Sequence, residues 1–181
     1  HLYTNQITPY FRAPHIYMGF PKRFVPSHTR VAHSTGGSSD AVFMTSRDGK
    51  SFKRWGEALI RPGPQRERWV NRNNMVAWGI LETRSGLAGT PNELSIYCVE
   101  GYKGFEGCKI RRYTLRLDGF VSAQAPLSGG ELSTKPLTFE GTQLVINYAT
   151  SAAGSIRVEL QDAEGRPIEG LGLADSTELF G

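Results

Sequence analysis

The apolar residues of this chain recur with the period of two that β-strands require, and no segment keeps a helical i, i+3, i+4, i+7 pattern over three turns. In residues 155–161, Ile156, Val158 and Leu160 alternate with three polar residues, as in a strand with one buried and one solvated face. Similar runs occupy residues 41–46, 93–100, 109–117 and 142–150. Clusters of Gly, Pro, Asn and Asp separate them, and 21 glycines among 181 residues favour many tight turns. We therefore predict an all-β protein.

The composition describes a globular chain and argues against several function classes. Hydrophobic residues make up 39% and charged residues 21%. No apolar run approaches the roughly 20 residues that span a bilayer, so we expect no membrane segment, and the first residues lack a signal-peptide pattern. The net charge of +4 permits a nucleic-acid partner, but no nucleic-acid-binding motif is present and we expect none. Phosphate loops, dinucleotide fingerprints and zinc-ligand spacings are also lacking, so we expect no cofactor and no metal.

The densest basic cluster is a loop that contains Arg61, Arg66, Arg68 and Arg72. One interpretation is a solvated or ion-paired loop. The other is a loop that binds an anionic or hydroxyl-rich ligand, because arginine is a rigid fork with several hydrogen-bond donors. On the second interpretation, Arg72 is a candidate binding residue.

A weak internal repeat organises residues 1–126. Residues 12–20 and 73–81 each follow a loop rich in proline and arginine, and each unit later contains a strand that ends at Asp-Gly. An outer strand, residues 52–60 or 120–126, follows in each unit, so the period is about 60–70 residues. Two units of four short antiparallel strands at this spacing predict two propeller-type blades.

The two Asp-Gly pairs have a structural interpretation. Asp48–Gly49 and Asp118–Gly119 join consecutive strands of the predicted blades. Asp-Gly favours tight turns, because Gly accepts a positive φ and Asp bonds its own backbone. We therefore interpret Asp48 and Asp118 as turn residues, far from any ligand site, and not as catalytic carboxylates.

Alternating strand direction places a different set of residues on the face opposite these turns. The candidate site residues, with Arg72 from the basic loop, are Arg12, His15, Asp40, Arg72, Asn73, Asn74 and Glu100. Carboxylates accept bonds from sugar hydroxyls or act as acid and base, while Arg and Asn fix orientation. Three residues have structural alternatives: His15 as an inner-strand residue, Arg12 as the partner of a carboxylate, and Glu100 as a loop cap.

Several segments resemble the five-bladed β-propeller glycoside hydrolases, the superfamily of fructosidases and arabinofuranosidases or xylosidases, in its uncharacterised bacterial branches. They are residues 8–21 (TPYFRAPHIYMGFP), the S-x-D-G-x-x-F hairpin at 46–52, residues 71–80 and residues 93–101. The resemblance covers residues 3–125 and implies a carbohydrate ligand, with Glu100 as general acid and Asp40 as the carboxylate that orients the substrate. The attacking carboxylate of these enzymes has no counterpart in the sequence.

Residues 127–181 read as meandering strands and resemble the β-sandwich that follows the propeller in many of these hydrolases. They offer only three or four strands, so we expect the C-terminal portion of a larger protein, active on glycosides or binding them. A non-catalytic carbohydrate-binding or assembly module is the alternative. Exposed strand edges predict homo-oligomers, and we favour an extracellular or periplasmic location.

Cys98 and Cys108 flank the loop at residues 99–107. If this loop is a hairpin centred on Lys103, the two cysteines face each other and a cross-strand disulfide is feasible. Two buried thiols are the alternative.

Overall fold

A computed structural model describes residues 1–29, 36–102 and 107–181. The prediction of an all-β protein is confirmed: the described residues form ten strands, and their one helical element is the 3-10 turn η1 (Arg66–Arg68). The chain divides into an N-terminal unit, His1–Val121, and a C-terminal unit, Ser122–Gly181. None of the described helices is long and apolar enough to cross a membrane.

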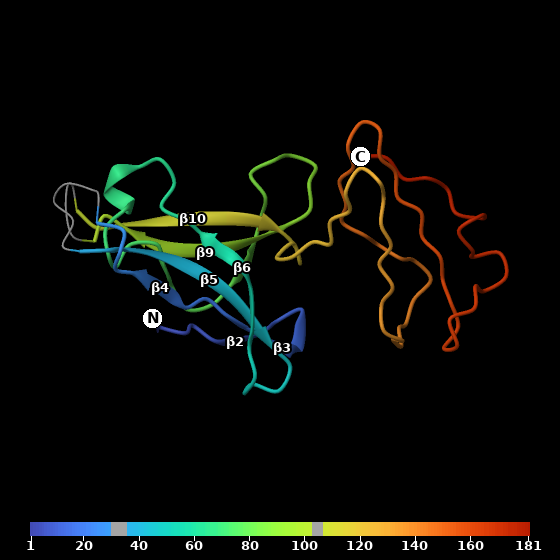
Figure 1. The fold of residues 1–181 in the computed structure, drawn as a ribbon, viewed down its shortest axis with the longest axis horizontal. Helices are drawn as coiled ribbons and strands as arrows, with labels where there is room; N and C mark the ends of the chain where they lie inside the picture. Colours follow the sequence, from blue (N-terminus) through green and yellow to red (C-terminus); the bar gives the residue numbers. More distant parts are fainter. Residues whose placement is uncertain (30–35, 103–106) are drawn as a thin grey trace. The chain divides into compact units, whose positions relative to one another are not determined.

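The first sheet of the N-terminal unit has six strands: β1 (Leu2–Tyr3), β2 (Thr8–Tyr10), β3 (Ala13–Gly19), β4 (Lys22–Val25), β5 (Ser38–Ser46) and β6 (Lys53–Ile60). Both β3 and β4 pair antiparallel with β5, so β3 and β4 run in the same direction. Similarly, β1 pairs with β4 and β2 with β3. The sheet is therefore a meander of four antiparallel segments, two of them interrupted (Figure 1).

The interruption between β3 and β4 falls at Phe20 and Pro21. Pro21 has no N–H to donate to the ladder, although its carbonyl accepts a 3.0 Å hydrogen bond from the Val42 amide. Phe20 is fully buried. Residues 13–25 thus form one interrupted strand, where the predicted blade required two strands of opposite direction before Asp40. That prediction is wrong, and the first strand of the unit begins near Leu2, before Arg12.

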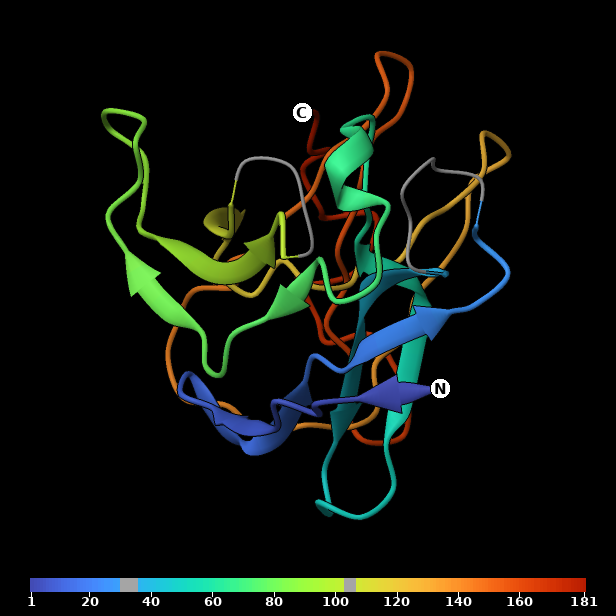
Figure 2. The same ribbon diagram turned by 90° about the vertical axis from the view of Figure 1, so that its left-hand side faces the viewer.

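The second sheet has four strands: β7 (Met75–Val76), β8 (Leu81–Thr83), β9 (Glu93–Glu100) and β10 (Lys109–Arg116). Strand β9 is central, with β10 on one side and both β7 and β8 on the other. The outer strand predicted for residues 120–126 does not form, because the chain turns at Leu117–Phe120 and then continues without strand structure. Figure 2 shows how the two sheets curl around a common interior.

The core lies between the two sheets. Phe20 and Phe43 stack with their ring centroids 5.5 Å apart, and Leu94 and Ile96 of β9 belong to the same buried cluster. Phe120 stacks on Phe43 at 5.1 Å, although it lies beyond the end of β10. The segment after β10 is therefore held on the first sheet by aromatic packing.

In the C-terminal unit, backbone hydrogen bonds join antiparallel segments of the chain, but these segments do not form strands. The two isolated bridges are Ile156–Leu179 and Gln161–Pro167. Large apolar residues of this unit, such as Leu127 and Val145, are exposed. A β-sandwich is therefore not established for these residues.

The register of the β9–β10 hairpin separates the two cysteines. Cys98 pairs with Arg111, so the hairpin is not centred on Lys103, which itself lies outside the described residues. Cys98 is buried, Cys108 is exposed, and both are free thiols. The disulfide hypothesis is wrong, because the expected hairpin centre was shifted toward β9. The alternative of two buried thiols holds for Cys98 and is wrong for Cys108.

Candidate functional site

Glu100, the predicted general acid, is the centre of a buried polar network at the end of β9. Its Oε1 lies 2.9 Å from Arg68 Nε and accepts hydrogen bonds from Arg111 Nε at 2.7 Å and from the Tyr113 hydroxyl at 3.1 Å. Glu100 is 5% exposed and Arg68 6%. Arg68 comes from η1, so the basic loop is ion-paired with the second sheet. The interpretation of the basic cluster as an ion-paired loop, and not as a ligand-binding loop, is thus correct for Arg68.

Asn73 and Asn74 are part of the same network. The Asn74 carboxamide oxygen accepts two hydrogen bonds from Arg68, at 3.1 and 2.9 Å, and its nitrogen donates to the Ser39 carbonyl at 2.8 Å. Asn73 donates to the Val70 carbonyl and accepts from the Tyr102 amide. Both asparagines are at most 1% exposed. Their side chains connect the loop to the sheets and are not open to a ligand.

Asp40 and Arg72 lie near this network. Asp40 is buried and accepts two hydrogen bonds from Arg23, at 2.9 and 2.5 Å. The adjacent Ser39 donates to the Asn73 carbonyl at 2.7 Å, and this hydrogen bond joins the start of β5 to the network. Arg72 is exposed and lies over the Tyr102 ring, 5.5 Å from its centroid. Four predicted residues therefore meet at one end of the unit: Asp40, Asn73, Asn74 and Glu100.

Arg12 and Asp118, which were expected on opposite faces, bind each other. Arg12 Nε donates to both Asp118 oxygens, at 3.1 and 3.2 Å, and the Tyr10 hydroxyl donates to Asp118 at 2.6 Å. Burial opposes ionisation of Asp118, but these hydrogen bonds outweigh it and lower its pKa. The prediction is wrong because Arg12 belongs to the turn between β2 and β3, not to the start of an inner strand at the other end. His15 is exposed on β3. It lies at the same end of the first sheet as Ser46, which pairs with Tyr17 of β3.

The turn interpretation of Asp48 is confirmed. Asp48 Oδ1 accepts hydrogen bonds from the Ser51 amide at 2.7 Å, the Lys50 amide at 2.8 Å and the Ser46 hydroxyl at 2.8 Å. The backbone bonds from Ser51 and Lys50 hold the pKa of Asp48 far below its usual range. Asp48 and Asp40 lie at opposite ends of β5, as expected.

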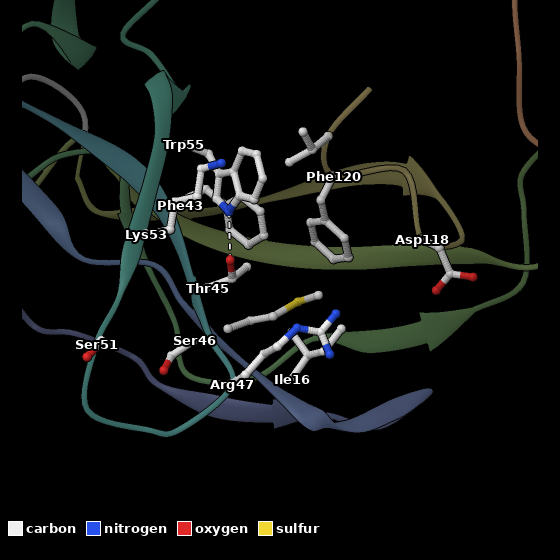
Figure 3. Close-up of a pocket in the computed structure, with 12 residues that line it drawn as sticks. Ile16, Phe43, Thr45, Ser46, Arg47, Ser51, Lys53, Trp55, Asp118 and Phe120 are labelled. Atoms are coloured by element: carbon white, nitrogen blue, oxygen red, sulfur yellow. Dashed lines mark hydrogen bonds between the residues drawn. The ribbon is translucent and has the colours of Figure 1, made fainter. Parts of the chain in front are cut away.

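A cavity that the sequence analysis missed lies over the first sheet (Figure 3). It has a volume of about 520 Å³. We call it the aromatic pocket; its lining residues include Ile16, Phe43, Arg47, Trp55, Asp118 and Phe120. Trp55 is held in orientation by a 2.7 Å hydrogen bond from its indole nitrogen to the Thr45 hydroxyl. Lys53 lies over the Trp55 ring, with Nζ 4.0 Å from the centroid.

The β5–β6 hairpin explains how these side chains meet. Phe43 is paired with Trp55 and Thr45 with Lys53, and every second residue of a strand points to the same face. The alternation of Phe43, Thr45 and Arg47 was therefore readable from the sequence. Phe120 and Asp118 come from the segment after β10, and nothing local in the sequence places them over this hairpin.

A smaller cavity of about 330 Å³ borders Glu100. Its lining is polar and consists of Arg66, Glu67, Glu100, Gly101, Gly107, Lys109 and Arg111. Among the residues that the structure describes, no three His, Cys, Asp or Glu side chains come together as they would to hold a metal ion. No family model matches this sequence, and no curated protein or solved structure is detectably similar to it.

Proposed function

We propose that this chain is a carbohydrate-binding protein that holds a glycoside in its aromatic pocket and does not hydrolyse it unaided. In this proposal the antiparallel segments of the N-terminal unit are propeller-type blades, and the C-terminal unit is part of a β-sandwich. The meander of four antiparallel segments in the first sheet supports the blade assignment.

The observation that carries the proposal is the chemistry of the aromatic pocket. A sugar ring has an apolar C–H face and a polar edge of hydroxyl groups. Ligand sites are mostly apolar and aromatic, with a few polar groups that fix orientation. Trp55 and Phe120 supply the apolar surface, with the buried Phe43 stacked against Phe120, and Ser51 and Asp118 are among the polar lining residues. A volume of about 520 Å³ suits one or two sugar rings.

Hydrolysis is the second candidate, because the smaller cavity borders Glu100. It would need two carboxylates on either side of the scissile bond, with Glu100 as acid and Asp40 as the orienting group. Yet each is occupied by arginine: Glu100 by Arg68 and Arg111, and Asp40 by Arg23. Such pairing is typical of structural ion pairs, and we favour binding without turnover.

Calorimetric titration with a panel of mono- and disaccharides tests the binding proposal. Trp55→Ala should lower the affinity about tenfold or more, because the sugar loses its main stacking surface. Trp78→Ala is the matched control, since Trp78 is 70% exposed and does not line the pocket. Equal loss in both variants, or no loss in Trp55→Ala, would contradict the proposal.

An assay on nitrophenyl glycosides tests the second candidate. We expect the chain to show no turnover above that of a folded Glu100→Gln variant, because a lone acid forfeits most of the rate enhancement. Turnover clearly above the variant would favour hydrolysis.

Self-association is also part of the proposal. Strands β6 and β10 each have one neighbouring strand among the described residues, β5 and β9 respectively, so their outer edges can accept another strand. Light scattering after gel filtration should detect dimers or larger species. A protein that stays strictly monomeric at millimolar concentration would contradict the proposed self-association.

A further inference from the structure

We infer that the aromatic pocket selects saccharides that carry an anionic group, a carboxylate or a sulfate, over neutral sugars of the same shape. The inference rests on the proposed function, because it names the class of glycoside that the same pocket binds. It is carried by the charged residues that line the pocket.

The cations of the pocket are Arg47 and Lys53. In Figure 3, Arg47 lies beside Ile16 on one side of the pocket, and Lys53 lies beside Trp55 on the other. Arg47 makes no hydrogen bond or ion pair with any residue in 1–29, 36–102 or 107–181. Lys53 contacts the Trp55 ring and has no carboxylate partner in the same part of the chain.

The one acidic residue of the lining is already neutralised. Asp118 accepts two hydrogen bonds from Arg12 and one from Tyr10. Arg12, Arg23 and Arg112 of this unit each have a carboxylate partner. Arg47 differs from them, because it combines a free guanidinium with a position on a cavity wall. The pocket therefore carries an excess of positive charge.

This excess favours a particular ligand chemistry. A guanidinium donates two parallel hydrogen bonds to a carboxylate or sulfate, and such charge-assisted bonds are about twice as strong as neutral ones. Arg47 and Lys53 are themselves exposed, so salt in the solvent partly screens this interaction. A neutral sugar stacks on the aromatic rings of the pocket but leaves the charge of Arg47 uncompensated.

Matched ligand pairs test the inference by calorimetry. The probes are methyl β-glucoside against methyl β-glucuronide, the corresponding galactose pair, and methyl galactoside 6-sulfate. At low salt we expect each anionic member to bind about tenfold more tightly than its neutral counterpart. The carboxylate and sulfate arms show which anion the pocket prefers. The advantage should shrink in 0.5 M salt, roughly as expected for partly exposed charges.

Variants separate a specific role of Arg47 from a general charge effect. Arg47→Gln should abolish most of the anionic advantage and leave the neutral affinity within about twofold. Arg54→Gln and Lys50→Gln, which remove cations of the same hairpin outside the pocket lining, should change neither.

Three outcomes would overturn the inference. They are equal affinity of the paired ligands, an equal effect of Arg47→Gln on both members, and tighter binding of uridine monophosphate, which would indicate a nucleotide ligand. The first two leave the proposed function intact. If no glycoside binds at all, the proposed function fails, and the inference fails with it.

Discussion

The two ends of the N-terminal unit use similar residue types in opposite ways. At one end, Glu100 and Arg68 are buried and paired with each other, and Asn74 accepts two further hydrogen bonds from Arg68. At the other end, Arg47 and Lys53 line an aromatic pocket without carboxylate partners among the described residues. Charged residues that find partners within the fold stabilise it. Charged residues that lack them beside a cavity are available to a ligand. The comparison therefore assigns structure to the first end and binding to the second.

The largest effect should come from breaking the buried ion pair. Glu100→Ala leaves the Arg68 guanidinium buried without a counter-charge and should lower the free energy of unfolding by about 3–5 kcal/mol. Glu67→Ala, which removes an exposed carboxylate from the same loop, should change it by less than about 0.5 kcal/mol. Urea denaturation measures both.

A double variant sharpens this prediction. Arg68→Met with Glu100→Leu removes both charges and should be less destabilised than either single substitution. A Glu100→Ala variant as stable as the parent would show that the network is not structural, and Glu100 would become available for chemistry.

Asp118 should make a smaller, pH-dependent contribution at the pocket end. Its hydrogen bonds from Tyr10 and Arg12 lower its pKa below the usual 3.8. The stability that these bonds give is therefore fully present above pH 4 and is lost as the pH falls through the lowered pKa. Asp118→Asn should lower the free energy of unfolding by about 1 kcal/mol at pH 7 and weaken the dependence of stability on pH below pH 4. Urea midpoints at pH 7 and pH 3 measure this, and a variant with the parental pH dependence would exclude Asp118 as its source.

The two thiols should differ in reactivity. Burial raises the pKa of Cys98 to about 12, whereas Cys108 is exposed. At pH 8 a thiol reagent such as dithionitrobenzoate should modify Cys108 in the folded protein and Cys98 only after denaturation. Release of two thiol equivalents from the native protein would contradict the burial of Cys98, and release of none would indicate a disulfide.

The smallest effect should come from Asp48. Asp48→Asn weakens the acceptor of the Lys50 and Ser51 amides and should lower the thermal midpoint only slightly. Ser46, Arg47 and Ser51 of this hairpin line the aromatic pocket, so the expectation that the hairpin lies far from any ligand site does not hold for the proposed site. We still expect unchanged glycoside affinity by calorimetry, because Asp48 itself does not line the pocket. A large loss of affinity in a folded variant would show that the turn positions Arg47.

Local patterns predicted part of this structure. The period of two revealed strands β5, β9 and β10, whereas the strands predicted at residues 142–150 and 155–161 do not form, and Asp-Gly revealed the Asp48 turn. The direction of the early strands could not be predicted from local patterns. Phe20 and Pro21 interrupt the strand pattern as a turn would, but the chain does not reverse its direction there. Residues 12–25 were therefore assigned to the wrong strands, and Arg12 to the wrong end.

The functional residues were harder to predict, because their surroundings come from distant parts of the chain. The sequence alone makes Glu100 a plausible catalytic residue. In the structure, Arg68 from a separate loop is ion-paired with it. Phe120 completes the aromatic pocket from beyond β10. The Trp55–Thr45 pair, in contrast, follows from one hairpin and could have been proposed from the alternation alone.

The most direct test of the account is a crystal of this chain soaked with a mixture of methyl glycosides and methyl glycosiduronates. We predict a sugar stacked on Trp55 in the aromatic pocket, with its anionic group against Arg47 and the Glu100 network unchanged. A sugar bound in the cavity beside Glu100, with the aromatic pocket empty, would contradict the account.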